Sequence, residues 1–167
     1  AEAARRGAGS LVVGIAPFGG VLPDHWLDDL EAALDAGLDV VSGLHTRLTA
    51  IPRLVAAAGR TGAGLVDVRH PTRTFPAASG RKRSGKRLLT VGTDCALGKK
   101  YAALALTGAL RRAGCPATFR ATGQTGLLIA GEGIVIDAVV ADFVAGAAEV
   151  LSPDSAPDHW DVIEGQG

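Results

Sequence analysis

The stretch LLTVGTDCALGKKY, residues 88–101, constrains the fold of this chain more than any other. An apolar run that is typical of a buried strand leads into a glycine-rich turn, and Gly98-Lys99 then opens a helix that Gly114 ends. Gly92 and Gly98 allow a tight turn with exposed backbone N–H groups, which form an anion-binding nest with the N-terminus of the helix. Lys99 adds a positive charge within reach of a terminal phosphate. The pattern therefore predicts a phosphate-binding loop in an α/β domain.

The loop departs from the usual phosphate-binding loop in two ways. Its spacing is Gly-x5-Gly-Lys, one residue longer than the common form, and Lys100 stands where nucleotidases of this class offer a Ser or Thr to magnesium. An ammonium group does not ligate a cation, so either Thr93 or Asp94 replaces that ligand, or the site binds a phosphate without magnesium. We expect Lys99 to lie exposed at the helix start. We assign the phosphate contacts to Gly92, Thr93, Asp94, Cys95, Ala96, Leu97, Gly98, Lys99 and Lys100.

Composition excludes several classes of partner. The 167 residues are 47% hydrophobic, which suffices for one substantial core or two small ones. Lys and Arg together number 17, as do Asp and Glu together. The net charge therefore does not favour binding to nucleic acid or to a membrane surface. No apolar run is long enough to span a bilayer, and the N-terminal residues lack the apolar core of a signal peptide. Two cysteines form no disulfide framework, so we expect a cytoplasmic protein.

The first half of the chain alternates between strand and helix patterns. Strands are expected at 11–16, 38–42 and 64–68, and helices at 24–36, where Asp24 is the predicted N-cap, and at 52–59. This order predicts a small doubly wound unit. His45 follows the second strand, where such sheets face a ligand crevice, and is therefore a candidate substrate-binding residue.

A basic, Pro- and Gly-rich segment at 69–87 interrupts this alternation. We interpret it as a solvated connector; the alternative is a basic rim beside a polyphosphate ligand. Nucleic-acid binding is disfavoured because no aromatic platform accompanies the charge. We divide the chain into domains at 1–80 and 81–167.

The second half predicts strands at 87–91 and 116–122, a polar loop at 123–126, an amphipathic helix at 136–151 and a last strand from Trp160. That last strand is apolar enough to need parallel neighbours on both sides. We infer that this domain is incomplete and that the chain is a piece of a longer protein.

Glu164 ends the last strand, and a carboxylate there is costly unless it is paired or bound to a metal. In a structural role we expect it to pair with Arg120 or Lys99. The loop resembles that of dethiobiotin synthetase, an ATP-dependent enzyme of the P-loop class. That resemblance implies that Glu164 holds magnesium, that Arg120 faces substrate and phosphate, and that Asp137 is a further metal carboxylate. From the residues alone, Arg120 can equally be a surface arginine and Asp137 a helix cap.

Longer motifs resemble a known family over nearly the whole chain. VGTDCALGKK, RATGQTGLLIAGEGIVIDAVVADFVAGAAE, DHWDVIEGQG, GIAPFGGVLPDHW and AGLDVVSGLHT are similar to the DgcN family, long known only as a domain of unknown function. The resemblance implies a Rossmann-like N-terminal domain joined to a P-loop NTPase-like domain, and members that extend further at both ends. It also implies N-acetylation of D-glutamate with acetyl-CoA, a step in D-amino-acid catabolism.

This resemblance implies that the loop binds the phosphates of coenzyme A. No phosphoryl group moves in an acetyl transfer, so the usual catalytic metal is not required. The reaction needs a base, for which Glu164 or Asp94 is the candidate, and donors for the oxyanion, for which the backbone of 123–126 is the candidate. Arg120 is the candidate cation for the acceptor's side chain, with Gly123, Gln124, Thr125 and His45 as further substrate contacts.

Two other classes stay open. The first is an ATP- and Mg²⁺-dependent ligase or kinase of the dethiobiotin synthetase type, in which Asp137 and Glu164 hold the metal. The second is a non-catalytic nucleotide-binding regulator. In the transferase interpretation, which we prefer, the partner is a small-molecule amino acid, and we expect a homo-oligomer without nucleic-acid or membrane partners.

Overall fold

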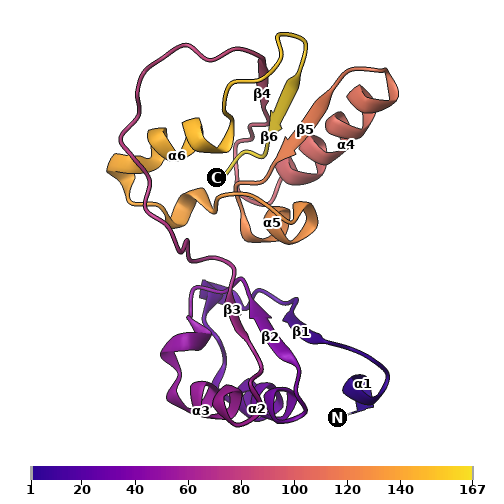
Figure 1. Cartoon of the computed structure of the whole chain (residues 1–167), viewed down its shortest axis with the longest axis vertical. Coiled ribbons are helices and arrows are strands. Elements are labelled where there is room, and N and C mark those ends of the chain that lie inside the picture. The colour runs from indigo at the N-terminus through magenta and orange to yellow at the C-terminus, as the bar shows by residue number, and fades with distance from the viewer. Residues whose placement is uncertain (1, 167) are drawn as a thin grey trace. The chain divides into compact units, whose positions relative to one another are not determined.

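The structure, a computed structural model, describes residues 2–166 as two compact units, one ending at His70 and the other beginning at Pro71 (Figure 1). Each unit is built on its own three-stranded sheet, and all the strand pairs are parallel. The predicted α/β class is confirmed. The boundary lies ten residues before the one expected from composition, because Phe75 is buried in the second unit against Ile134, Ala147 and Leu151.

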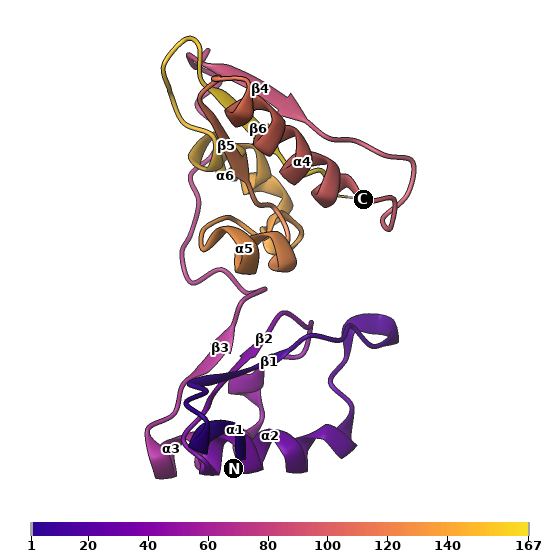
Figure 2. The same ribbon diagram turned by 90° about the vertical axis from the view of Figure 1, so that its right-hand side faces the viewer.

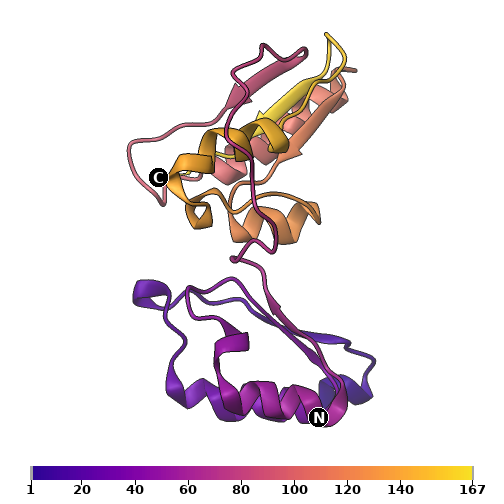
Figure 3. The same ribbon diagram turned by 60° about the vertical axis from the view of Figure 1, so that its left-hand side comes forward.

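The N-terminal unit has the strand order β1-β2-β3, and its two longer helices lie on one side of the sheet (Figures 2 and 3). Leu34, Val40 and Leu54 are fully buried between sheet and helices. The predicted N-cap at Asp24 is wrong: residues 24–26 form a 3-10 turn without a side-chain cap, and α2 follows it. The elements are α1 (Glu2–Arg5), β1 (Ser10–Val13), α2 (Leu27–Asp35), β2 (Asp39–Ser42), α3 (Pro52–Thr61) and β3 (Leu65–Asp67), with 3-10 turns at Phe18–Gly20, Asp24–Trp26 and Leu48–Ala50.

The C-terminal unit has the strand order β4-β6-β5, so its last strand is central and pairs with both others. The predicted need of that strand for two parallel neighbours is confirmed. Val162 packs with Ala103 of α4, whereas Ile163 packs toward α6, so the two helices cover opposite faces of the sheet. The elements are β4 (Lys86–Leu89), α4 (Lys99–Arg112), β5 (Ala117–Arg120), α5 (Gln124–Ala130), α6 (Val144–Leu151) and β6 (Trp160–Ile163), with 3-10 turns at Ile136–Ala138 and Ala141–Phe143.

Two expected elements of this unit are wrong. The polar loop expected at 123–126 is the start of α5, whose first residue is Gln124. The helix expected at 136–151 begins only at Val144, after two 3-10 turns. Ahead of these turns the chain runs beside the residues that follow β5, since the N–H groups of Ile134 and Ile136 donate to the carbonyls of Ala121 and Thr122.

The basic segment contributes to the packing of α6. Nη1 of Arg83 donates to the carbonyl oxygen of Ala148 at 3.2 Å, and Nη2 of Arg87 donates to that of Ser152, the C-cap residue of α6, at 3.2 Å. Cations satisfy the last carbonyls of a helix and interact favourably with its dipole. The interpretation as a solvated connector is therefore wrong for Arg83 and Arg87, which are partly buried.

Glu149 of α6 also holds the basic segment 69–87 against the helix. Its carboxylate accepts hydrogen bonds from the N–H groups of Ser79 at 2.9 Å and Gly80 at 3.0 Å. Hydrogen bonds from Ser79, then Gly80 and the charge of Arg83, hold the pKa of Glu149 below its ordinary value. A carboxylate with a lowered folded-state pKa contributes stability above its unfolded pKa and loses it as the pH falls through the folded pKa.

We therefore predict that Glu149→Gln lowers the melting temperature at neutral pH, and that the difference from the parent disappears in acid below the lowered pKa. Scanning calorimetry at both pH values measures it, with the exposed Glu2→Gln as control. An equal difference at both pH values would mean that ionisation of Glu149 contributes nothing.

Candidate functional site

The glycine-rich loop joins β4 to α4, as predicted. Gly98 caps α4 in the left-handed conformation, with φ of 90°, which an L side chain rarely adopts. Residues 91–97 are exposed. The loop therefore presents its backbone to solvent ahead of a 14-residue helix, which is the arrangement that binds anions.

Thr90 fastens this loop to the end of β6. Its Oγ1 donates to the carbonyl oxygen of Lys99 at 3.0 Å and accepts the N–H of Gly165 at 3.2 Å. A Cβ at position 165 would overlap the carbonyl oxygen of Thr90, so only glycine allows this approach. These contacts hold the loop beside the end of β6, which carries Glu164.

Lys99 is buried, with 6% of its surface exposed. Its Nζ donates to the carbonyl oxygen of Asp94 and, at 3.4 Å, to that of Cys95. The expectation of an exposed lysine at the helix start is wrong, because the side chain folds under the loop. Its charge lies beneath the loop, where it can serve both the loop conformation and a bound anion.

A cavity of about 460 Å³ lies where the loop, α5 and β6 converge. These three segments are far apart in sequence, and parallel strands bring their carboxyl ends to the same edge of the sheet. Gly92, Thr93 and Asp94 belong to the loop but not to this lining. The lining consists of Cys95, Ala96, Leu97, Gly98, Lys99, Lys100, Tyr101, Gly123, Gln124, Thr125, Glu164, Gly165 and Gln166.

Glu164 is the only carboxylate residue that the described part of the chain contributes to this lining, and it is 6% exposed. Its Oε2 accepts the N–H groups of Thr122 at 3.1 Å and Gly123 at 3.2 Å. A side chain at Gly126 would overlap Oε2, so glycine lets α5 approach the carboxylate. Among residues 2–166, neither Arg120 nor Lys99 forms the ion pair with Glu164 that a structural role predicted.

The arrangement leaves Oε1 of Glu164 without a hydrogen bond from any described residue. A buried carboxylate with one oxygen satisfied and one open can accept a proton or a hydrogen bond from a bound amine. Residues 2–166 contain no group of three or more His, Cys, Asp or Glu side chains that could hold a metal ion. Asp137 lies exposed in a 3-10 turn, outside the described lining.

Asp94 is less suited than Glu164 to act as a base. Its Oδ1 accepts the N–H of Cys95 at 2.6 Å. Hydrogen bonds from Cys95, ahead of the charge of Lys99, hold the pKa of Asp94 below its ordinary value, and a lower pKa makes a weaker base. Between the two predicted candidates, the geometry favours Glu164.

Tyr101 and Gln166 line the cavity but were missed from the sequence. Tyr101 is 69% exposed, and Nζ of Lys100 lies 4.8 Å from the centroid of its ring. Nε2 of Gln166 donates to Oγ1 of Thr122 at 2.7 Å, beside the N–H that holds Glu164. Tyr101 could have been predicted as a site residue, because it is an aromatic residue directly after the two lysines of the loop.

Two predicted substrate residues are not among the described lining residues of this cavity. Arg120 belongs to the lining of a different cavity and pairs with Asp161. His45 is in the N-terminal unit, just after β2, where its N–H donates to the carbonyl oxygen of Gly20 at 2.8 Å and its own carbonyl oxygen lies 3.2 Å from Nε2 of His70. Across residues 2–166, no helix is long and apolar enough to cross a membrane.

Comparison with known proteins gives relatives for both units. Residues 1–71 match a family described as a domain of unknown function, DUF1611_N, Rossmann-like domain, and residues 76–167 match DUF1611_C, P-loop domain. A crystal structure of a DUF1611 family protein from Anabaena variabilis ATCC 29413 is 42% identical, with a TM-score of 0.87 over 99% of this chain and 49% of that one.

Two curated relatives carry the name D-glutamate N-acetyltransferase. The protein from Pseudoalteromonas sp is 51% identical and the one from Tritonibacter scottomollicae 52% identical, each over 166 residues. The match covers 99% of this chain and 50% of each relative, so the chain spans about half the length of the curated relatives it matches. The resemblance inferred from the motifs is confirmed, and the chain belongs to the DUF1611 family, as a Rossmann-like domain followed by a P-loop domain.

Proposed function

We propose that the protein is an N-acetyltransferase that moves an acetyl group from acetyl-CoA to the amine of D-glutamate or a related amino acid. The observation that carries the proposal is the buried carboxylate of Glu164, which lines the same cavity as Lys99, Lys100 and the glycine-rich loop. The names of the two curated relatives support the same reaction.

The cavity suits the phosphates of coenzyme A. Backbone N–H groups at the start of α4 and the two lysines are donors for a pyrophosphate and a 3′-phosphate. Lys100 supplies charge at the position where a P-loop nucleotidase supplies a magnesium ligand. The donor set therefore fits an anionic cofactor whose phosphates stay intact during the reaction.

In the proposed mechanism Oε1 of Glu164 takes a proton from the acceptor amine. The amine attacks the thioester carbonyl, a C–N bond forms, and the C–S bond breaks as the oxyanion collapses; the thiolate of coenzyme A leaves and gains a proton. The N–H of Gly123, expected to serve the oxyanion, donates to Glu164 and orients the base instead. The N–H of Thr125, in the first turn of α5 and in the lining of the cavity, has no intrahelical acceptor and is our candidate for the oxyanion.

A ligand panel tests this assignment against the magnesium-dependent ligase and the regulator. Thermal shift with CoA, acetyl-CoA, ATP and ADP, each with and without Mg²⁺, compares the ligands directly. We expect stabilisation by CoA and acetyl-CoA without Mg²⁺, by about 2.7 kcal/mol at a hundredfold excess over Kd. Stabilisation by Mg²⁺-ATP alone would favour the ligase. Nucleotide binding without acetyl transfer would favour the regulator.

We predict that Lys100→Thr weakens CoA binding by about 1–3 kcal/mol, the size of a charge-assisted contact, and creates no magnesium-dependent ATP binding. Lys86→Thr is the matched control, because Lys86 also lies over an aromatic ring, 5.1 Å from the centroid of Trp160, but outside the described lining of the cavity. Titration calorimetry measures both variants. An unchanged affinity for CoA in Lys100→Thr would remove Lys100 from the phosphate site.

A further inference from the structure

A second cavity, of about 390 Å³, lies in the C-terminal unit and shares no described lining residue with the first. Its apolar wall comes from Phe119, Leu127, Ile134 and Leu151. The charged members of the lining are Arg73, Arg120 and Glu132. Nothing in the proposed acetyl transfer uses these three side chains.

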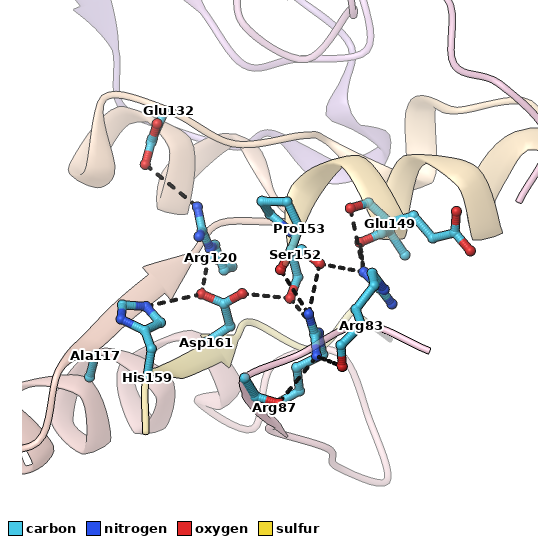
Figure 4. Close-up of polar contacts among 12 residues, drawn as sticks. Arg83, Arg87, Ala117, Arg120, Glu132, Glu149, Ser152, Pro153, His159 and Asp161 are labelled. Atoms are coloured by element: carbon cyan, nitrogen blue, oxygen red, sulfur yellow. Dashed lines mark hydrogen bonds and ion pairs between the residues drawn. The ribbon is translucent and has the colours of Figure 1, made fainter. Parts of the chain in front are cut away.

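The guanidinium of Arg120 is held in place by a buried network (Figure 4). Its Nε donates to Oδ1 of Asp161 at 2.8 Å, and Oδ2 of the fully buried Asp161 accepts the hydroxyl of Ser152 at 2.6 Å. Nε of Arg87 donates to the same hydroxyl oxygen at 2.8 Å, and His159 approaches Asp161 at 3.5 Å. Because these contacts fix the orientation of Arg120 before any ligand arrives, binding requires little further ordering.

The guanidinium of Arg120 lies in the lining and is partly accessible. The side chain is 19% exposed, and Oε1 of Glu132 lies 3.9 Å from Nη1, beyond hydrogen-bond distance. A carboxylate suits this group, because the planar guanidinium can donate two parallel hydrogen bonds to its two oxygens.

Arg73 brings a second guanidinium to the same cavity. It is exposed and stacks on the buried ring of Phe75, 5.1 Å from the centroid. Two arginines above an apolar wall match a short carbon chain that carries carboxylates, and Glu132, with its side chain 71% exposed, matches an ammonium group. The charges of the cavity thus complement those of an acidic amino acid.

We propose that this second cavity binds a small carboxylate of the acidic amino-acid class, through Arg120 and Arg73. The ligand is an effector distinct from the acetyl acceptor, because this cavity shares no described lining residue with the one that contains the proposed base, Glu164. Binding itself does not depend on the proposed acetyl transfer; only the distinction from the acceptor does.

The test uses the protein at its full natural length and two probes, D-glutamate and glutarate, with direct binding measured by calorimetry. Arg73→Gln removes an exposed side chain, and Arg120→Lys keeps a cation beside Asp161 while removing the planar fork. We expect each variant to weaken glutarate, and D-glutamate at this cavity, by roughly 10-fold or more, the size of one charge-assisted contact. Arg112→Gln, an exposed arginine of α4, is the matched control and should change nothing. CoA affinity should stay constant in all three.

Kinetics then distinguishes an effector from the acceptor. We expect glutarate binding to be lost in Arg73→Gln while KM for D-glutamate and kcat, measured without glutarate, are unchanged. A KM for D-glutamate that rises in step with the loss of glutarate binding would place the acceptor in this cavity and contradict the effector assignment. Failure of the parent to bind either probe, or equal affinity in Arg73→Gln and in a correctly folded Arg120→Lys, would overturn the proposal. Neither result would bear on CoA binding, which is measured separately.

Discussion

Replacing Glu164 by glutamine should lower the rate of acetyl transfer by roughly 10²–10⁴-fold, the usual worth of a positioned base. The amide keeps an oxygen for the N–H groups of Thr122 and Gly123, so the local structure should persist. It does not accept the proton of the acceptor amine. Acetyl-CoA affinity should change little, since the loop and its lysines are untouched. Release of free thiol from acetyl-CoA measures the rate, and calorimetry measures the affinity.

The control for this variant is Glu149→Gln. Glu149 is also a carboxylate held by two backbone N–H groups, but it lies outside the described lining of the cavity. We expect it to retain turnover at temperatures where it stays folded. Parental turnover in Glu164→Gln would eliminate the proposed base and leave a carboxylate that only holds the start of α5.

Lys99→Met should weaken CoA binding by about 1.5–3 kcal/mol, as expected for a contact with a charged group. The variant keeps the apolar stem but removes the ammonium, so the carbonyls of Asp94 and Cys95 also lose their donor. Stability should fall as well, because Lys99 is buried. Calorimetry with CoA and a denaturation curve measure the two effects. The exposed Lys82→Met is the control, and parental CoA affinity in Lys99→Met would contradict a phosphate role for the loop.

The sequence predicted those parts of the fold whose signal is local. The loop before α4 was found because glycines and a Gly-Lys pair follow an apolar strand, and β6 because its apolar run needs neighbours on both sides. The start of α6 was misplaced because helical spacing of apolar residues does not reveal that Ile134 and Ile136 bond to the end of β5. The start of α5 was taken for a loop because Gly123 and Gly126 are typical of turns, whereas here they allow the helix to approach Glu164.

The candidate site was predicted less completely, because its geometry depends on register and packing. Glu164 and the loop meet as expected, since parallel strands end at one edge of a sheet. Arg120 does not join them. Asp161, one strand away, faces the same side of the sheet as Arg120 and holds its guanidinium. The burial of Lys99 likewise follows from the approach of β6 to the loop, which is a tertiary contact.

The central claim is tested most directly by incubating the full-length protein with acetyl-CoA and D-glutamate in the absence of ATP. Free thiol and N-acetylated amino acid are followed together, by a thiol reagent and by mass spectrometry. The account predicts one thiol for each acetylated amino acid, without added Mg²⁺. Absence of both products, together with ATP consumption once Mg²⁺-ATP and a carboxylate substrate are supplied, would contradict it.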